Sequence, residues 1–598
     1  MRLRGMEIMR RHQALLAGFA ILVMVLLAYI PAMRGGFVWD DDQYVTENPL
    51  LTAPDGLKQI WFSLNSPSQY FPLVYTTLRV EHSLWGVNPF GYHLVNVLLH
   101  AANALLLWIV LRRLRIRGAW FAAAIFALHP VQVESVAWVT ELKNVLSTLF
   151  CLLTVLAWMR FTEEGKRTPW RYYAASLVLC AFALFSKTTA CTIPAVLLIV
   201  LWIRRQRITW QRVAQVMPFA VMGLLMGFLA IWWEQHHQGT RGAEFALAPM
   251  ERILVASRAL WFYVGKLVWP TKLAFSYPKW EINAHDPVQY LWLGACLAAV
   301  IVLLAYRKSW GRGPLIAAVF FGAVLSPMLG FISLYTFRYT YVADHYQYVA
   351  SIGPIVLFAA LVTRKWKRPQ VRHVVPAAVL CALGILTWRQ GFIYAGPEAL
   401  WRDTLVKNPS SWMAHEGLGV VMAKQGSPDE AVAHYYKALE IRPDHWQVYV
   451  DLGLAYVELG EPDRAVEILK QGVEQCPSRP ELHFSLANTL VGQGRLQEAA
   501  THYRTTVKMD PKFAEAYCNL ALILLQQGKL DEAIKENRAA IRARPDFAGA
   551  YFNLAVLYFD QGRFAEAWEQ VRLCRVHGLE PDPEFLAALS QEMPDPGK

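Results

Sequence analysis

Apolar residues are distributed along the chain in two different ways. Up to about residue 395 they form blocks of 16 to 22 residues separated by short basic or aromatic loops, which is typical of a polytopic membrane protein. Beyond residue 396 they recur singly at helical spacing. The pattern therefore predicts an all-α fold, in which a helical membrane domain (residues 1–395) precedes a soluble helical domain.

About eleven of the apolar blocks are predicted to cross the membrane. Because cytoplasmic loops carry an excess of Lys and Arg, the basic loops set the direction of the spans. This rule places the N-terminus and the loops 112–117, 166–171, 204–212, 307–312 and 364–372 in the cytoplasm, and the C-terminal domain outside. The predicted spans are 14–33, 92–111, 119–138, 144–160, 171–186, 188–203, 213–233, 288–305, 313–332, 346–362 and 374–394.

The outer side of this topology holds the longer loops, which are residues 34–91, 234–287 and 333–345. One apolar block within them, residues 253–269, carries Arg258 and Lys266 and ends in Trp-Pro. Counting it as a span would move a basic loop outside. We therefore predict an interfacial helix that lies along the outer surface.

Composition and charge agree with a membrane protein. Of the 598 residues, 55% are hydrophobic and only 17% are charged. The formal charge of +12 would suggest nucleic-acid binding in a soluble protein, but here much of it lies in short loops between apolar blocks, so orientation in the membrane explains it better and no nucleic acid is expected. The eight cysteines show no CxxC and no paired spacing, so neither a zinc site nor a disulfide framework is indicated.

The first outer loop begins with three consecutive carboxylates, Asp40, Asp41 and Asp42, directly after the first apolar block. Adjacent carboxylates raise one another's pKa and attract cations, which suits proton abstraction or metal binding. A solvated, negatively charged turn is the alternative interpretation of the same three residues.

Other unusual polar residues fall on the same predicted side. Lys187 lies between two apolar segments with almost no loop, a position that favours a polar cavity or a bound anion, although its side chain could also snorkel to lipid headgroups. Asp344 and His345 open a predicted span together with Tyr346. The pair His236-His237 is a weaker metal candidate, because adjacent side chains on a helix point about 100° apart.

The last 190 residues contain a strict 34-residue period. Gly426, Gly460, Gly494, Gly528 and Gly562 follow this spacing, as do Ala431 and Pro409 with their four later equivalents. This is the tetratricopeptide repeat, so residues 409–598 are predicted to form an α-solenoid of about five repeats with a capping helix, after a linker at 396–408. Its groove would recruit a protein, or the solenoid would act as a spacer or self-association surface.

Several motifs together resemble the transmembrane and tetratricopeptide repeat-containing O-mannosyltransferases and their bacterial relatives. The motifs keep the family's order over nearly the whole chain. They are FVWDD from Phe37, NP at Asn48, YHLVNVLLH from Tyr92, ALHPVQVESVAW from Ala127, Ser186-Lys187, and ADHY from Ala343.

The resemblance implies a GT-C glycosyltransferase that uses a polyprenyl-phosphate-linked sugar, with its active site at the extracytoplasmic face and inversion of the anomeric centre. It assigns base or metal-binding roles to Asp40 and Asp41, with Mg or Mn as the possible cation at Asp41. Lys187 and His345 are the expected contacts for the donor phosphate. Supporting roles are expected for His129, Glu134, Asp344 and Tyr346.

The chain departs from the family pattern at two positions. Relatives often carry Arg where this chain has Phe71 and His345, so two positive charges near the donor phosphate are missing or weakened. The basic loops fit a bacterial inner membrane, with the repeats in the periplasm. The predicted function is hexosyl or mannosyl transfer to hydroxyls of a secreted or envelope protein, and the alternative is a non-catalytic, membrane-anchored scaffold for envelope protein assembly.

Overall fold

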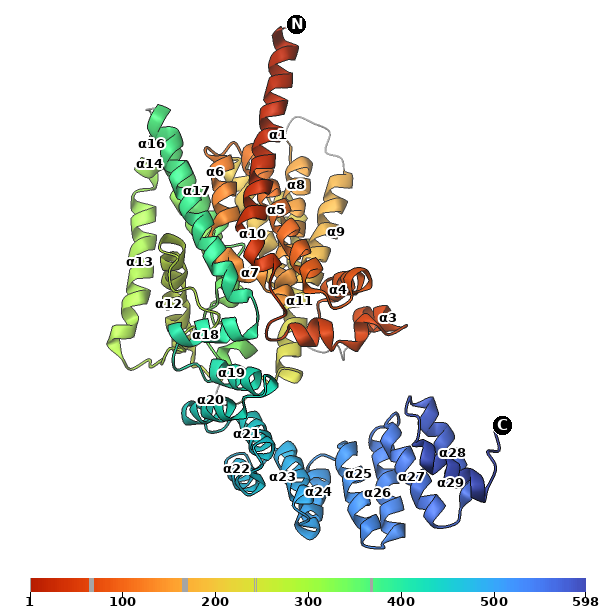
Figure 1. Ribbon diagram of the computed structural model, residues 1–598. Coiled ribbons are helices and arrows are strands. Elements are labelled where there is room, and N and C mark those ends of the chain that lie inside the picture. The colour runs from red at the N-terminus through yellow and green to blue at the C-terminus, as the bar shows by residue number, and fades with distance from the viewer. Residues whose placement is uncertain are drawn as a thin grey trace. The chain divides into compact units, whose positions relative to one another are not determined.

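The computed structural model describes residues 2–63, 69–163, 170–240, 242, 245–365 and 369–597. All regular elements in these ranges are helices, as the hydrophobic pattern predicts. The chain divides into two compact units, Met1–Ala414 and His415–Lys598, which are called here the membrane unit and the repeat unit. Figure 1 shows the helices of both units.

The membrane unit contains eighteen helices within the described residues. They are α1 (Arg2–Ala28), α2 (Ile30–Met33), α3 (Gly56–Phe62), α4 (Pro72–Trp85), α5 (Pro89–Arg113), α6 (Ala119–Leu128), α7 (Val133–Ala137), α8 (Leu142–Phe161), α9 (Trp170–Ser186), α10 (Ile193–Ile203), α11 (Trp210–His236), α12 (Pro249–Val268), α13 (Tyr290–Ala305), α14 (Arg307–Trp310), α15 (Gly313–Leu325), α16 (Ile352–Lys365), α17 (Pro369–Gly391) and α18 (Pro397–Lys407).

Each of the eleven predicted spans falls on apolar helix, but the lengths differ. Five described segments are long and apolar enough to cross a membrane: Pro89–Arg113, Val139–Phe161, Trp210–His236, Pro287–Ala305 and Val374–Tyr394. Five others are apolar helices of 10–17 residues, and the eleventh is a bent pair. α12 is not among the long apolar helices; its Ala256, Ala259 and Tyr263 are buried in a cluster with residues of α15.

The predicted span 119–138 is a pair of helices with a bend of 56° between them, at His129. The residue before a proline disfavours helical geometry, and His129 has φ −76° and ψ 126° ahead of Pro130. α6 therefore ends at Leu128, and a short 3-10 turn and α7 carry the chain onward with every residue from 130 to 145 buried. The bend brings polar residues that sequence analysis expects in an outer loop into the interior of the unit.

Residues 396–408, the expected linker, are instead mostly helix. α18 spans Pro397–Lys407, with Leu400, Trp401 and Thr404 buried. The ring of Trp401 contacts the edge of Phe275 at a centroid distance of 5.5 Å. Because these apolar side chains bury against the membrane unit, the compact unit continues past residue 395 to Ala414.

The repeat unit is built from helix pairs of nearly equal length, as the 34-residue period predicts. Each of its five period glycines has φ between 71° and 76°, a left-handed conformation that glycine adopts without a Cβ clash, and it ends the first helix of its pair. The five pairs are α19 (Trp412–Lys424) with α20 (Pro428–Ile441), α21 (Trp446–Glu458) with α22 (Pro462–Gln475), α23 (Pro480–Gly492) with α24 (Leu496–Met509), α25 (Ala514–Gln526) with α26 (Leu530–Ala543), and α27 (Ala548–Asp560) with α28 (Phe564–Val576). The helix α29 (Pro583–Glu592) follows them. The first turn of α19 belongs to the membrane unit.

Candidate active site

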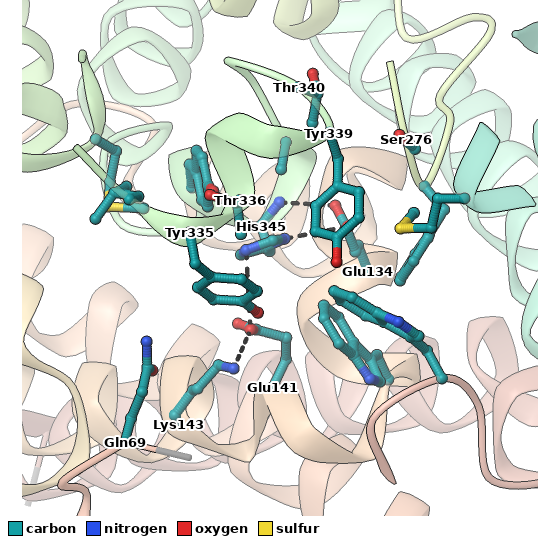
Figure 2. Close-up of a pocket in the computed structure, with 18 of the residues that line it drawn as sticks. Gln69, Glu134, Glu141, Lys143, Ser276, Tyr335, Thr336, Tyr339, Thr340 and His345 are labelled. Carbon is teal, nitrogen blue, oxygen red and sulfur yellow. Dashed lines mark hydrogen bonds and ion pairs between the residues drawn. The ribbon is translucent and has the colours of Figure 1, made fainter. Parts of the chain in front are cut away.

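A polar pocket with an empty volume of about 690 Å³ collects most of the unusual residues of the membrane unit. Its charged and titratable lining includes Lys187 and His345, which sequence analysis singles out. Figure 2 shows side chains that line the pocket. Its ionisable non-phenolic residues are Glu134, Glu141, Lys143, Lys187, Glu234 and His345, and its aromatic walls are Trp39, Trp138, Phe275, Tyr335, Tyr339 and Tyr346.

Glu141 is the centre of the charged network. Its side chain has no exposed surface, and its two oxygens lie 3.0 Å from Nζ of Lys143 and 3.2 Å from Nζ of Lys187. The Asn144 amide also donates to it. A buried carboxylate needs such partners, because charge withdrawn from water is costly unless it is paired. One acid thus holds two ammonium groups at the wall of the pocket.

His345 connects this network to a second acid. Its Nδ1 lies 3.1 Å from Oε1 of Glu134, and its backbone N–H donates to Oε2 of the same residue at 2.9 Å. Its Nε2 is 3.9 Å from Glu141. The imidazole therefore lies between two carboxylates, and Figure 2 shows the dashed lines that join them. Glu134 therefore holds the backbone of His345 by a hydrogen bond and places a carboxylate beside its ring.

Asp40, like Asp41, is not a lining residue of the pocket, and it contacts the pocket wall through Trp138. The indole N–H of Trp138 donates to Oδ1 of Asp40 at 3.1 Å, and the Trp138 ring also lies against His345, with centroids 5.7 Å apart. Burial raises the pKa of Asp40 to about 6, despite the opposing charge of Lys143. A half-buried carboxyl with this pKa is able to accept a proton near neutral pH.

Asp41 has a different environment from its neighbour. Its side chain is completely buried, with Oδ1 accepting from the Thr140 backbone N–H at 2.8 Å and from the Thr140 hydroxyl at 2.5 Å. Oδ2 accepts from the Val38 N–H at 2.9 Å. Burial, followed by the charge of Asp40, raises the pKa of Asp41 to about 7. Asp41 therefore joins the first outer loop to residue 140 and does not line the pocket.

The backbone next to Asp40 is strained. Trp39 has φ +49°, a left-handed conformation that is rare for a bulky residue and is kept only where the surroundings enforce it. Its ring contacts Trp138, Phe275 and Tyr339 at centroid distances of 5.4, 5.3 and 6.0 Å. The aromatic contacts hold Trp39 in the pocket wall and thereby fix the direction in which Asp40 points.

The expected supporting residues divide between the pocket and its surroundings. Tyr346 and Glu134 line the pocket, and the hydroxyl of Tyr346 lies 2.5 Å from that of Thr336. His129 lies outside the lining, where its Nε2 bonds the carbonyl of Leu267 at 3.0 Å and its Nδ1 accepts from the N–H of Val131. Its contacts hold the bend after α6.

Asp344 also lies outside the pocket lining. It is buried and accepts from the Tyr277 hydroxyl at 2.9 Å. Burial, followed by the charge of Glu134, raises the pKa of Asp344 well above its usual range. The geometry does not bring Asp344 to His345 as an orienting acid, since Glu134 makes those contacts.

Three residues of this network, Glu141, Lys143 and Asn144, are not predicted from the sequence. The available signal was a Glu and a Lys directly before the apolar block that begins at residue 144, where isolated charges at a span boundary usually face headgroups. Only the bend at His129 buries them together. Lys143 adds a second ammonium to the site.

The described residues do not fit a divalent cation at Asp41. Both of its oxygens already accept hydrogen bonds, and no group of three His, Cys, Asp or Glu side chains suitable for a metal occurs in the parts of the chain that the structure describes. His236 and His237 instead stack on Trp232 and Trp233, with centroids 4.8 and 4.2 Å apart.

Comparisons with known proteins agree with the motifs. Residues 67–233 match the family described as dolichyl-phosphate-mannose-protein mannosyltransferase, and residues 381–445, 422–488, 484–546 and 538–572 match tetratricopeptide repeat families. The chain is 25% identical over 496 residues to the protein O-mannosyl-transferase TMTC1 of Homo sapiens, covering 72% of this chain and 55% of that protein.

Two further relatives give the same result. The protein O-mannosyl-transferase F38B6.6 of Caenorhabditis elegans is 21% identical, with 72% of this chain and 63% of that protein covered. The human protein O-mannosyl-transferase TMTC4 is 24% identical, with 69% and 64% covered. The expected resemblance to these O-mannosyltransferases is confirmed, and with the apolar helices it indicates an integral membrane protein. The chain spans 55–64% of the length of these relatives.

Some solved structures are similar to part of the chain. They include MamA (25% identity, TM-score 0.25, covering 27% of this chain and 94% of that one) and YrrB, a TPR protein with an unusual peptide-binding site (21%, TM-score 0.27, covering 32% and 97%).

Proposed function

We propose that the protein is a membrane glycosyltransferase that moves a mannosyl or related hexosyl group from a polyprenyl-phosphate donor to a hydroxyl of a protein, at the extracytoplasmic face. One observation carries this proposal: a polar pocket holding two ammonium groups is joined to an apolar pocket within the membrane unit. A lipid-phosphate sugar has the same two parts, an anionic sugar phosphate and a long apolar tail. The relatives named protein O-mannosyl-transferases support the sugar and the acceptor class.

The apolar pocket has an empty volume of about 860 Å³ and shares Gln69, Lys187, Glu234, Met328 and Leu334 with the polar one. Part of its wall is α11, on which Leu225 and Phe228 have 64% and 67% of their surface exposed, as expected for lipid-facing side chains. In this proposal the isoprenoid tail leaves toward the lipid along α11. Lys187, which lines both pockets, meets the phosphate.

The chemical step needs a base and a stabilised leaving group. The acceptor oxygen attacks the anomeric carbon and forms the new glycosidic bond, while the bond from that carbon to the phosphate oxygen breaks. The acceptor proton passes to the carboxylate of Asp40. The lipid phosphate leaves with its negative charge next to Lys143 and Lys187, which Glu141 holds in place before the reaction.

Attack and departure on opposite faces of the sugar invert the anomeric centre. The aromatic walls would confine the sugar between these two groups, since Trp39, Trp138 and Phe275 present apolar ring faces and edges to the pocket. The carboxylates of the network, Glu134 and Glu141, are already engaged with His345 and the two lysines, so a single displacement is the simpler course. No step requires a metal.

The repeat unit is proposed to recruit the acceptor protein. The solenoid fold provides an extended concave surface, which tetratricopeptide repeats commonly use for polypeptide. With the N-terminus in the cytoplasm, the repeats and the pocket would share the outer side, and the basic loops suit a bacterial inner membrane. The acceptor is then a secreted or envelope protein.

The test is sugar transfer by the full-length protein in liposomes. Radiolabelled polyprenyl-phosphate mannose, polyprenyl-phosphate glucose and GDP-mannose are offered separately with envelope protein extract, and labelled protein is counted. The proposal predicts labelling from a polyprenyl-phosphate hexose, with mannose preferred, and none from the nucleotide sugar. Labelling from GDP-mannose, or from no donor, would contradict it, and the second result would favour a scaffold.

A further inference from the structure

A large apolar groove remains outside the proposed reaction. It has a cavity volume of about 640 Å³ and lies among α5, α8, α10, α15 and α16. Ligand sites usually have volumes of roughly 300–1000 Å³, so the groove has room for a bound molecule. It shares no lining residue with the polar pocket, and a smaller cavity of about 460 Å³ lies between them.

Three arginines line one end of this groove: Arg205 after α10, Arg307 at the start of α14, and Arg312 before α15. All three are exposed, and no ion pair or side-chain hydrogen bond is found for them among the described residues. Figure 1 shows α14 at the end of the membrane unit where α1 begins. The groove is thus apolar along its length and cationic at its mouth.

Arg205 and its neighbour Arg204 have different contacts. Arg204 donates to the carbonyl of Met159 at 3.0 Å and to the hydroxyl of Thr162 at 3.1 Å. Gln206 donates to the carbonyl of Thr162 at 2.7 Å. Between these two anchored side chains, Arg205 has φ +57°, which reverses the chain after α10. The anchored neighbours therefore fix the turn, while the guanidinium of Arg205 faces the mouth of the groove.

The depth of the groove matches one leaflet of a bilayer. α10 has 11 residues and lines the groove from Ile193 to Ile203, which corresponds to about 16 Å at a rise of about 1.5 Å per residue. Half of a hydrocarbon core is about 15 Å. The far end is reached at Cys151 and Thr192, which the smaller cavity shares. A lipid with its headgroup at the arginines would end its chains there.

We propose that this groove binds an anionic two-chain glycerophospholipid of the leaflet on the N-terminal side, with the phosphate at Arg205, Arg307 and Arg312 and the acyl chains among α5, α10 and α15. Basic pockets between membrane helices recognise such headgroups. The bound lipid is distinct from the sugar donor, because its charged end lies at the opposite end of the groove from Lys187. It fills an apolar volume that would otherwise separate α10 from α5.

The experiment measures lipid binding to the intact, detergent-purified protein by native mass spectrometry. Dioleoylphosphatidylglycerol is titrated against dioleoylphosphatidylcholine. Wild type is expected to prefer the anionic lipid, and R205Q/R307Q/R312Q is expected to bind it roughly a hundredfold more weakly, since each arginine near a headgroup contributes to the attraction. The control R117Q/R207Q/K308Q removes the same charge from exposed residues outside the groove lining and should bind as wild type does.

A second variant tests the groove itself. Ala317 of α15 lines it, so Ala317→Phe fills acyl-chain space while every arginine stays. This variant should lose the bound lipid although all three arginines are present. Equal binding of both lipids by wild type, equal loss in the control triple variant, or full retention in Ala317→Phe would each overturn the proposal. None of these results depends on whether the protein transfers a sugar.

Discussion

Two segments of the membrane unit supply carboxylates to the same region, and they hold them in opposite ways. In residues 37–48 the acids accept hydrogen bonds from neutral donors: Asp40 from an indole, and Asp41 from a hydroxyl and two backbone N–H groups. In residues 134–144 the acids face cationic or protonatable groups, with Glu141 between two lysines and Glu134 on His345.

The difference separates two kinds of chemistry. At Asp40 and Asp41 burial raises the pKa more than the neutral hydrogen-bond donors lower it, which gives the carboxylate the proton affinity that a base needs. A carboxylate that is paired with lysines orders positive charge, which is what a departing phosphate needs. The partners of each carboxylate therefore decide its proposed role, and a separate substitution can test each role.

The largest expected effect is that of Asp40→Asn on transfer. Removing a general base lowers the rate by about 10²–10⁴-fold. Since Asp40 is half-buried with one indole donor, the asparagine oxygen can replace the acceptor, and the melting temperature should stay near that of wild type. Rates are measured in liposomes at saturating donor. A variant with wild-type rates would remove Asp40 from the mechanism.

Replacement of Glu141 tests the ion pairs that it forms with Lys143 and Lys187. Glu141→Gln leaves Lys143 and Lys187 buried without their carboxylate, and loss of one partner of a buried ion pair destabilises by about 3–5 kcal/mol. Denaturant unfolding in detergent measures the change in free energy. Glu47→Gln, at an exposed position of the first loop, is the matched control and should change little. Equal stability of the two variants would argue against the network.

Lys187→Met is expected to act mainly on donor binding. The ammonium lines both the polar and the apolar pocket, and a hydrogen bond to a charged group contributes about 1.5–3 kcal/mol, or roughly 10- to 150-fold in affinity. The KM for the polyprenyl-phosphate sugar should rise by that factor. Lys266→Met, a lysine outside the pocket lining, serves as the control. An unchanged KM would exclude Lys187 from the phosphate site.

Asp41→Asn should damage stability more than chemistry. One of its oxygens becomes an amide N–H that faces backbone donors from Val38 or Thr140, which leaves a buried donor unsatisfied at about 1–3 kcal/mol. The melting temperature should fall, and transfer per folded molecule should stay within severalfold of wild type. The reverse outcome, a stable but inactive protein, would exchange the roles of Asp40 and Asp41.

The repeat unit follows from sequence more completely than the site does. A strict 34-residue period places glycine at each turn, and every one of these glycines has the left-handed backbone that such a turn requires. The capping helix α29 also lies where it is predicted, over Pro583–Glu592. Periodicity succeeds there because each repeat contacts mainly its neighbours in the chain.

The site depends instead on contacts between distant segments. Trp138 and Asp40 are 98 residues apart, and His345 and Glu134 are 211 residues apart. Sequence motifs singled out Asp40, Lys187 and His345, but spacing along the chain carries no information about which of two adjacent aspartates is enclosed by donors. The predicted spans 119–138 and 144–160 leave Glu141 and Lys143 in the short connection between them, because hydropathy does not report a tertiary feature such as the bend at His129.

The smallest expected effect, and the most direct test of Asp40 as the base, is the pH dependence of kcat/KM for wild type. Burial raises the pKa of Asp40 to about 6, so the carboxylate that accepts the proton is lost as the pH falls through that value. The value of kcat/KM should rise about tenfold per pH unit below about pH 6 and level off above about pH 7. A sugar phosphodiester donor has no group that titrates in this range. A limb near pH 6 is the predicted result; a rate that is flat from pH 5 to pH 7, or that falls as the pH rises, would contradict the account.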